Sequence, residues 1–194
     1  MSEGVLGRPD RAMSRSDIEG LLLSARVAHF ATVGADGEPY VVPNLFVYAS
    51  GRIYLHTALA GHFRRNVEHR PRLSVALTAP GEVYPYGAFA CDLSTSYASV
   101  VGFGTVAIES NAAVKSQFFD RFLAKYANTR WNQPRSFYPR LDQATVYRVE
   151  LERLTGKRNP LPPMAERWPA QNRTKSPGVV PPVGHGAEAI SNRK

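Results

Sequence analysis

Short segments in which apolar and polar residues alternate make up much of the first 151 residues. Alternation with a period of two places successive side chains on opposite faces, which is the pattern of a half-buried β-strand. Turn sequences such as Asp36-Gly37 and Ser50-Gly51 separate the first three segments and are typical of tight hairpins. We therefore expect six strands, at residues 29–33, 40–48, 52–56, 73–77, 97–108 and 145–151.

Three other segments have the spacing of amphipathic helices. Ser16 and Glu19 match a capping box, in which each residue satisfies a free backbone N–H at the start of a helix. A helix is expected there over 17–25, a short one over 61–70, and a third beginning after Asn111, which can cap it. Six strands in tight hairpins with few helices predict a mainly β protein, a small antiparallel barrel.

The length of 194 residues suits one domain of ordinary size. We expect a flexible N-terminal arm at 1–15, the barrel domain at 16–157, and a Pro-rich basic tail at 158–194. The net charge is +8, and residues 155–194, with seven basic and two acidic side chains, supply +5 of it. Because most of the excess charge lies in the tail, we interpret it as a solvated basic segment. Nucleic-acid binding through the tail is the alternative.

Several classes of protein are excluded by what the chain lacks. No run of about 18 apolar residues is present, so no membrane span is expected. The polar first 15 residues lack the apolar core of a signal peptide, which favours a cytoplasmic protein. The only cysteine, Cys91, excludes an intramolecular disulfide and any multi-cysteine metal site.

The segment 57–66 leaves a predicted strand and enters a predicted helix, and it carries a hydroxyl and two arginines. A helix start presents free N–H groups and positive dipole charge, and Arg64 or Arg65 could bind a phosphate bidentately. Thr57 lies beside them. The segment lacks the glycines of a Walker loop or a dinucleotide fingerprint. A phosphate cradle and a solvated basic helix face are the two readings that the residues allow.

Four of the five histidines lie in the first 70 residues, but none has the spacing of a metal site. No metal is therefore expected. His56 ends a strand beside the candidate cradle, where it could bind a ligand or simply cap the strand. Cys91 opens a hydroxyl-rich stretch and is read as a small buried residue; a Cys–His nucleophile pair is the alternative.

These residues also resemble a known family. The segments 29–33 and 43–46 with the Asp36-Gly37 turn, and the segment 53–58 followed by Gly61-His62, are similar to pyridoxamine 5′-phosphate oxidase-like, FMN-binding split-barrel proteins. The segment 91–100 and residues 155–157 resemble the branch that includes nitroimidazole-resistance proteins. The resemblance covers about residues 16–157.

The resemblance implies a six-stranded antiparallel split barrel that forms a homodimer, with two FMN sites at the subunit interface. Phosphate contacts would come from the turn after the third strand, the ring would lie against the second strand, and further contacts would come from the third and fifth strands. Many relatives have a lysine where this chain has Phe63, so either neighbouring arginine could substitute. The implied cofactor-binding residues are Pro43, Asn44, Leu45, His56, Thr57, His62, Arg64, Arg65 and Ser99.

An FMN-dependent oxidoreductase is the function that the resemblance implies. It would transfer electrons from a reduced nicotinamide to a small organic acceptor, for instance a nitroaromatic compound. The cofactor supplies the redox chemistry, so no residue can be named as a catalytic acid or base. The alternative is a non-catalytic flavin- or haem-binding protein, and FAD or a deazaflavin could replace FMN.

Overall fold

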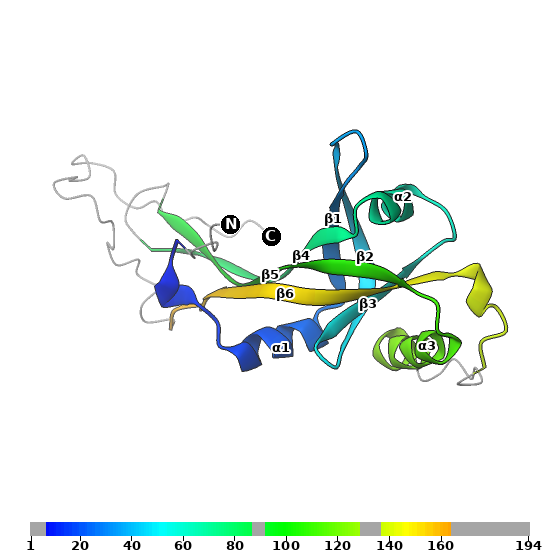
Figure 1. Ribbon diagram of the computed structural model, residues 1–194. Coiled ribbons are helices and arrows are strands. Elements are labelled where there is room, and N and C mark those ends of the chain that lie inside the picture. The colour runs from blue at the N-terminus through cyan, green and yellow to red at the C-terminus, as the bar shows by residue number, and fades with distance from the viewer. Residues whose placement is uncertain (1–6, 87–91, 129–136, 164–194) are drawn as a thin grey trace, which may run out of the picture. The chain divides into compact units, whose positions relative to one another are not determined.

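The structure is a computed structural model that describes residues 7–86, 92–128 and 137–163. Six strands form a closed antiparallel barrel in the order β1-β2-β3-β6-β5-β4, as Figure 1 shows. The predicted mainly β fold with six antiparallel strands is therefore confirmed. The strands are β1 (Val27–Val33), β2 (Pro39–Ala49), β3 (Arg52–Thr57), β4 (Arg72–Pro85), β5 (Leu93–Glu109) and β6 (Thr145–Asn159).

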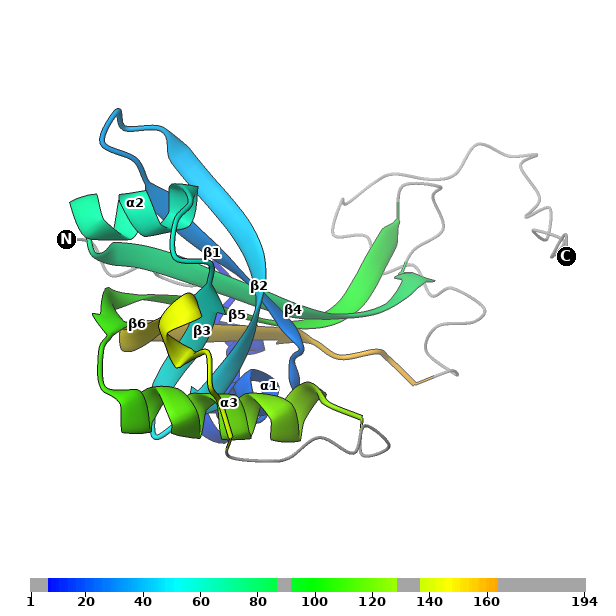
Figure 2. The same cartoon turned by 90° about the vertical axis from the view of Figure 1, so that its right-hand side faces the viewer.

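The helices lie on two sides of the barrel. They are α1 (Arg15–Ser24), α2 (His62–His69) and α3 (Ala112–Tyr126), with two 3₁₀ turns, η1 (Pro9–Arg11) and η2 (Leu141–Gln143). In Figures 1 and 2, α2 lies above the strands, whereas α1 and α3 lie below them. Along the described residues, no helix combines the length and apolar character needed to cross a bilayer.

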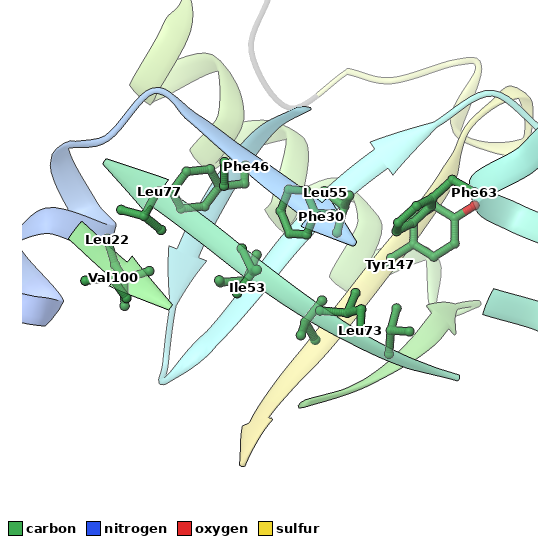
Figure 3. Close-up of a cluster of buried hydrophobic side chains, with 14 of the residues drawn as sticks. Leu22, Phe30, Phe46, Ile53, Leu55, Phe63, Leu73, Leu77, Val100 and Tyr147 are labelled. Carbon is green, nitrogen blue, oxygen red and sulfur yellow. The ribbon is translucent and has the colours of Figure 1, made fainter. Parts of the chain in front are cut away.

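The barrel interior is filled by side chains from every strand and from two helices. Phe30, Phe46, Leu55 and Tyr147 are fully buried there, and Phe63 reaches the same cluster from α2 (Figure 3). Leu22 and Ile18 enter from α1. The interior is therefore a packed core, and any ligand site must lie on the outer face or at the barrel ends.

The first helix begins two residues earlier than its sequence predicts. Ser14, not Ser16, is the N-cap, and its Oγ accepts the N–H of Asp17 at 3.2 Å. The expected capping box was wrong because Ser14 and Asp17 have the same favourable spacing two residues upstream. Part of the expected N-terminal arm is also bound to the barrel, since Met13 N–H donates to the carbonyl of Gly156 at 3.0 Å.

Three strands, β4, β5 and β6, extend beyond their predicted ends. The outer parts of β4 and β5, residues 80–86 and 92–97, form a compact unit of their own with residues 159–163. Within this unit the Ser96 Oγ accepts the N–H of Glu82 at 2.8 Å. The side chain of Asn159 donates to the hydroxyl of Tyr84 at 3.1 Å. Backbone pairing of β4 with β5 and these side-chain hydrogen bonds, rather than an alternating apolar pattern, hold this region, which is why the sequence pattern missed it.

Barrel closure depends on a close approach between β5 and β6. A Cβ added at Gly104 would lie 2.0 Å from the backbone oxygen of Glu150, so no larger residue fits without moving a strand. We expect Gly104→Ala to lower the free energy of unfolding by about 2–4 kcal/mol, measured by urea denaturation.

Gly20 provides the matched control. It lies within α1, and a Cβ there would meet nothing within 4 Å. Gly20→Ala should raise stability by about 0.5–1 kcal/mol, because alanine is the better helix former. Equal effects of the two substitutions would contradict the role assigned to Gly104.

Candidate functional site

The turn between β3 and α2 is held by side chains at the end of the barrel. Thr57, the last residue of β3, pairs with Thr145 of β6, and its Oγ1 lies 3.0 Å from the hydroxyl of Tyr147. Arg64 donates from Nη1 to the carbonyl of Leu59 at 2.7 Å and to Thr145 Oγ1 at 3.0 Å. Arg64 therefore binds the turn to β6, and Glu68 takes its Nε–H at 2.7 Å.

The start of α2 presents unused backbone donors. Gly61 has a φ of 148°, a conformation that favours glycine, and no side chain caps the helix. The first backbone bond of this turn runs from the N–H of Arg65 to the carbonyl of Gly61 at 3.1 Å. The N–H groups of residues 62–64 consequently have no acceptor within the helix, which is the arrangement that anions favour.

His62 opens the helix with its ring stacked on Tyr40 of β2, at a centroid distance of 4.3 Å and an interplanar angle of 15°. Arg65 follows three residues later, so the two side chains share one helix face. Arg65 is exposed, and among the described residues its side chain has no hydrogen-bond or ion-pair partner. Of the two arginines, Arg64 is thus committed to the fold, whereas Arg65 is available to a ligand.

The outer face of β2 carries an apolar strip. Val41 is 57% exposed, and Pro43 and Leu45 follow on the same side of the strand. Asn44 lies between them on the opposite face, where its Nδ2 donates to the carbonyl of His56 at 2.9 Å. Pro43 and Leu45 are thus on a surface that can meet a ligand, whereas Asn44 fastens β2 to β3.

His56 lies under α3 in an aromatic cluster. Its ring centroid is 5.7, 5.4 and 5.1 Å from those of Phe118, Phe119 and Phe122. Its Nδ1 is buried and has no hydrogen-bond partner among the described residues. Burial lowers the pKa of this imidazole from its usual 6.5. His56 follows Leu55, which pairs with Phe46 in the β2–β3 ladder, so its side chain is on the outer side of the sheet, as is that of Leu45.

Two contacts fasten the end of α3 to the first strands. The hydroxyl of Tyr126 lies 2.7 Å from the carbonyl of Phe46 and 2.8 Å from that of Arg26. Lys125 Nζ lies 4.1 Å from the centroid of the Phe46 ring and donates to the Phe46 carbonyl at 3.2 Å. Burial, with Arg26 nearby, lowers the pKa of Lys125 to about 8. No sequence pattern pointed to these two residues, because their partners are distant in the chain.

Within one chain, Ser99 lies far from the start of α2. Its Oγ donates to the carbonyl of Lys157, which follows Thr145 by twelve residues along β6. An extended strand of that length spans roughly 40 Å. Cys91 lies outside the described residues. Within the described residues, no group of three histidine, cysteine, aspartate or glutamate side chains could hold a metal ion.

A family model described as pyridoxamine 5′-phosphate oxidase matches residues 14–158. The chain belongs to the pyridoxamine 5′-phosphate oxidase family. The match covers the whole barrel and the candidate site, from the N-cap of α1 to the last residues of β6. No match is found among curated proteins.

Solved structures of the same fold include proteins of several kinds. A putative 5-nitroimidazole antibiotic resistance protein from Bacteroides thetaiotaomicron is 22% identical, with a TM-score of 0.65 over 75% of this chain and 85% of that one. The flavocytochrome Anf3 from Azotobacter vinelandii is 21% identical, with a TM-score of 0.70 over 82% and 74%. An FAD- and haem-binding protein from Mycobacterium smegmatis is 22% identical, with a TM-score of 0.64 over 77% and 73%. At these identities the likeness establishes the fold.

The environment of His56 predicts a pH dependence of stability. Because its folded pKa is below 6.5, the unfolded chain takes up the proton first as the pH falls. The free energy of unfolding should therefore decrease below pH 6.5. His56→Phe keeps an aromatic ring in the cluster but cannot be protonated. In this variant the free energy of unfolding should therefore decrease less as the pH falls below 6.5. Chemical denaturation between pH 5 and 8, roughly the range that brackets an imidazole pKa, measures it.

The control is His69→Gln, which removes an exposed imidazole at the end of α2. This variant should retain the slope of the wild-type protein. If His56→Phe also retained the full slope, titration of a different group would be responsible.

Proposed function

We propose that this protein is a flavin-dependent oxidoreductase whose cofactor, FMN, binds across the start of α2 and the outer face of β2. One observation carries the proposal: an uncapped helix start, an uncommitted Arg65 and an exposed apolar strip occur together on elements joined by the His62–Tyr40 stack. The first two suit a phosphate and the third suits a flat apolar ring.

The phosphate end rests on charge and geometry. A phosphomonoester carries nearly two negative charges near neutral pH. The N–H groups of residues 62–64 and the dipole of α2 favour such a group, and Arg65 can add bidentate hydrogen bonds. His62 would contribute a further donor from the same helix face. Phe63 is buried in the core and contributes only its backbone N–H.

The ring end rests on the apolar strip. The isoalloxazine is planar and largely apolar, and it would cover Val41, Pro43 and Leu45. The His56 ring closes one edge of this surface from beneath α3. When bound, the flavin supplies the electron transfer. The residues of this chain orient it and restrict the access of water.

A second copy of the chain would complete the site. The strip is exposed in one protomer, and Ser99 lies far along β6 from the cradle, so we propose a homodimer in which the partner covers the ring and contributes its own fifth strand. Sedimentation of a stable, FMN-loaded monomer at micromolar concentration would contradict this arrangement.

Electrons would pass from a reduced nicotinamide to a small organic acceptor, with nitroaromatic compounds as one class to test. Reduced nicotinamides are available in the cytoplasm. A chain with one cysteine cannot form an intramolecular disulfide, which suits that reducing compartment. The test is the absorption spectrum of the freshly purified protein, mass analysis of the released ligand, and anaerobic titration with NADH and NADPH. Bleaching of the flavin band is expected. A flavin-loaded protein that no donor reduces would be a binding protein instead.

The second candidate is a non-catalytic flavin- or haem-binding protein. It is favoured by the exposed imidazole of His62 and by the solved relatives that bind haem. Titration with haemin distinguishes it, since a Soret band that is lost in His62→Ala would support haem ligation. If no such band appeared, haem binding would be rejected and flavin binding would remain.

The two neighbouring arginines should behave differently when replaced. Arg65→Gln should weaken FMN binding by about tenfold or more and leave riboflavin binding and thermal stability nearly unchanged, because only the phosphate contact is lost. Arg64→Gln should lower the thermal stability of the protein, since the turn loses its hydrogen bonds to Leu59 and Thr145. Flavin fluorescence titration and thermal denaturation measure the two effects.

Riboflavin is the control ligand, because it has the ring and lacks the phosphate. If Arg65→Gln weakened riboflavin and FMN by the same factor, Arg65 would act on the ring or on the fold. The phosphate assignment would then be wrong.

A further inference from the structure

A cavity lies beside α3, which is on the opposite side of the strands from α2 in Figures 1 and 2. It has a volume of about 130 Å³ and lies between α3 and the β2–β3 hairpin. Its floor consists of Val47, Val114 and Phe118, and the first and last of these are 5% and 2% exposed. A pocket with a dry floor of this kind accepts the apolar body of a small molecule.

Positive charge gathers at the rim of the cavity. Arg52 and Arg121 both line it, and no carboxylate does. Arg52 Nε lies 2.6 Å from Glu150 Oε1, and Arg148 Nε lies 3.2 Å from the same oxygen. Arg148 also pairs with Glu109 at 3.1 Å, so Arg52 and Arg148 are balanced by two carboxylates, and the uncompensated positive charge at the rim is that of Arg121.

Arg121 has no such partner. It is exposed, and in the part of the chain that the structure describes no hydrogen bond or ion pair engages its guanidinium. It follows Gln117 and Val114 at spacings of four and seven residues, so the three line the cavity from one face of α3. Tyr54 lines the cavity from β3, and Ser50 lines it from the turn before that strand. The lining therefore combines a guanidinium and neutral polar side chains with an apolar floor.

We propose that this cavity binds a small monocarboxylate with a planar apolar body, the carboxylate paired with Arg121 and the body packed on Val47, Val114 and Phe118. Arg121 matches a carboxylate bidentately, and Gln117 can donate a further hydrogen bond. The volume admits a ligand about the size of a single substituted ring. A free phosphate would leave the apolar floor uncovered, which is why a carboxylate with a body is the better match.

The site is separate from the proposed flavin site. Its lining comes from α3 and the β2–β3 hairpin, and it shares no residue with the start of α2 or the strip of Val41, Pro43 and Leu45. Binding should therefore occur in the flavin-free protein and in the FMN-loaded protein alike. A failure of the flavin proposal would not remove it.

The experiment is a titration of the full-length protein with sodium benzoate at constant ionic strength. Binding is monitored by calorimetry and by the chemical shifts of backbone amides in the nuclear magnetic resonance spectrum. Saturable shifts are expected in residues 47–54 and 114–121. Acetate, which lacks the body, and benzyl alcohol, which lacks the charge, should each bind about tenfold or more weakly than benzoate. Inorganic phosphate should bind more weakly as well.

Three variants test the residues. Arg121→Gln should weaken benzoate about tenfold, because the charge-assisted pair is lost. Gln117→Glu places a carboxylate four residues before Arg121, a spacing that favours the helix, so it should block benzoate while the protein stays folded. Arg153→Gln removes an exposed charge that stacks on Phe103, away from the cavity, and should leave benzoate binding unchanged.

Several results would overturn the proposal. These are no saturable benzoate binding, equal affinity for benzoate and acetate, tighter binding of phosphate than of benzoate, or unchanged affinity in Arg121→Gln. Loss of binding in Arg153→Gln to the same degree as in Arg121→Gln would show a general charge effect and would also reject the site.

Discussion

The pairing of β3 with β6 is the interaction on which the candidate site depends. Its register joins Leu55 to Tyr147 inside the barrel and His56 to Val146 outside it. The inward residues belong to the main core, and the outward ones lie under α3. At the end of the same ladder Thr57 meets Thr145, where Arg64 anchors the turn that leads into α2. One short strand thereby fixes the core, the position of α3 and the start of α2.

Much of the barrel could be predicted because its strands are encoded locally. Alternation and turn sequences indicated all six strands, and Asn111 caps α3 as expected, with its Oδ1 accepting the N–H of Ala113 at 2.9 Å. The outer parts of β4 and β5 could not be predicted, because contacts such as those of Asn159 with Tyr84 join residues far apart in the chain. Local pattern carries no information on such partners.

The candidate site was predictable as a region but not residue by residue. Arg64 and Arg65 are adjacent and chemically identical, so only their directions from α2 separate the arginine that stabilises the turn from the one that faces solvent. The surroundings of His56 depend on which strands α3 covers, and that follows from barrel closure. Ser99 was correctly placed on the fifth strand, whereas its position along the barrel required the pairing with β6.

The packing of α3 links the cavity beside the β2–β3 hairpin to the apolar strip on β2. Phe118 lines the small cavity beside the β2–β3 hairpin, and the same ring contacts His56 at the edge of the apolar strip. The Tyr126 hydroxyl accepts the N–H of Phe46 at 3.1 Å and lies within 2.8 Å of the carbonyls of Phe46 and Arg26, so a shift of α3 would break these contacts. Because packed side chains move together rather than singly, any displacement of Phe118 from one side must be accommodated at His56 on the other. The aromatic cluster, together with β2, which carries both Leu45 and Val47, therefore connects the arginine-rimmed cavity to the surface proposed to hold the flavin ring.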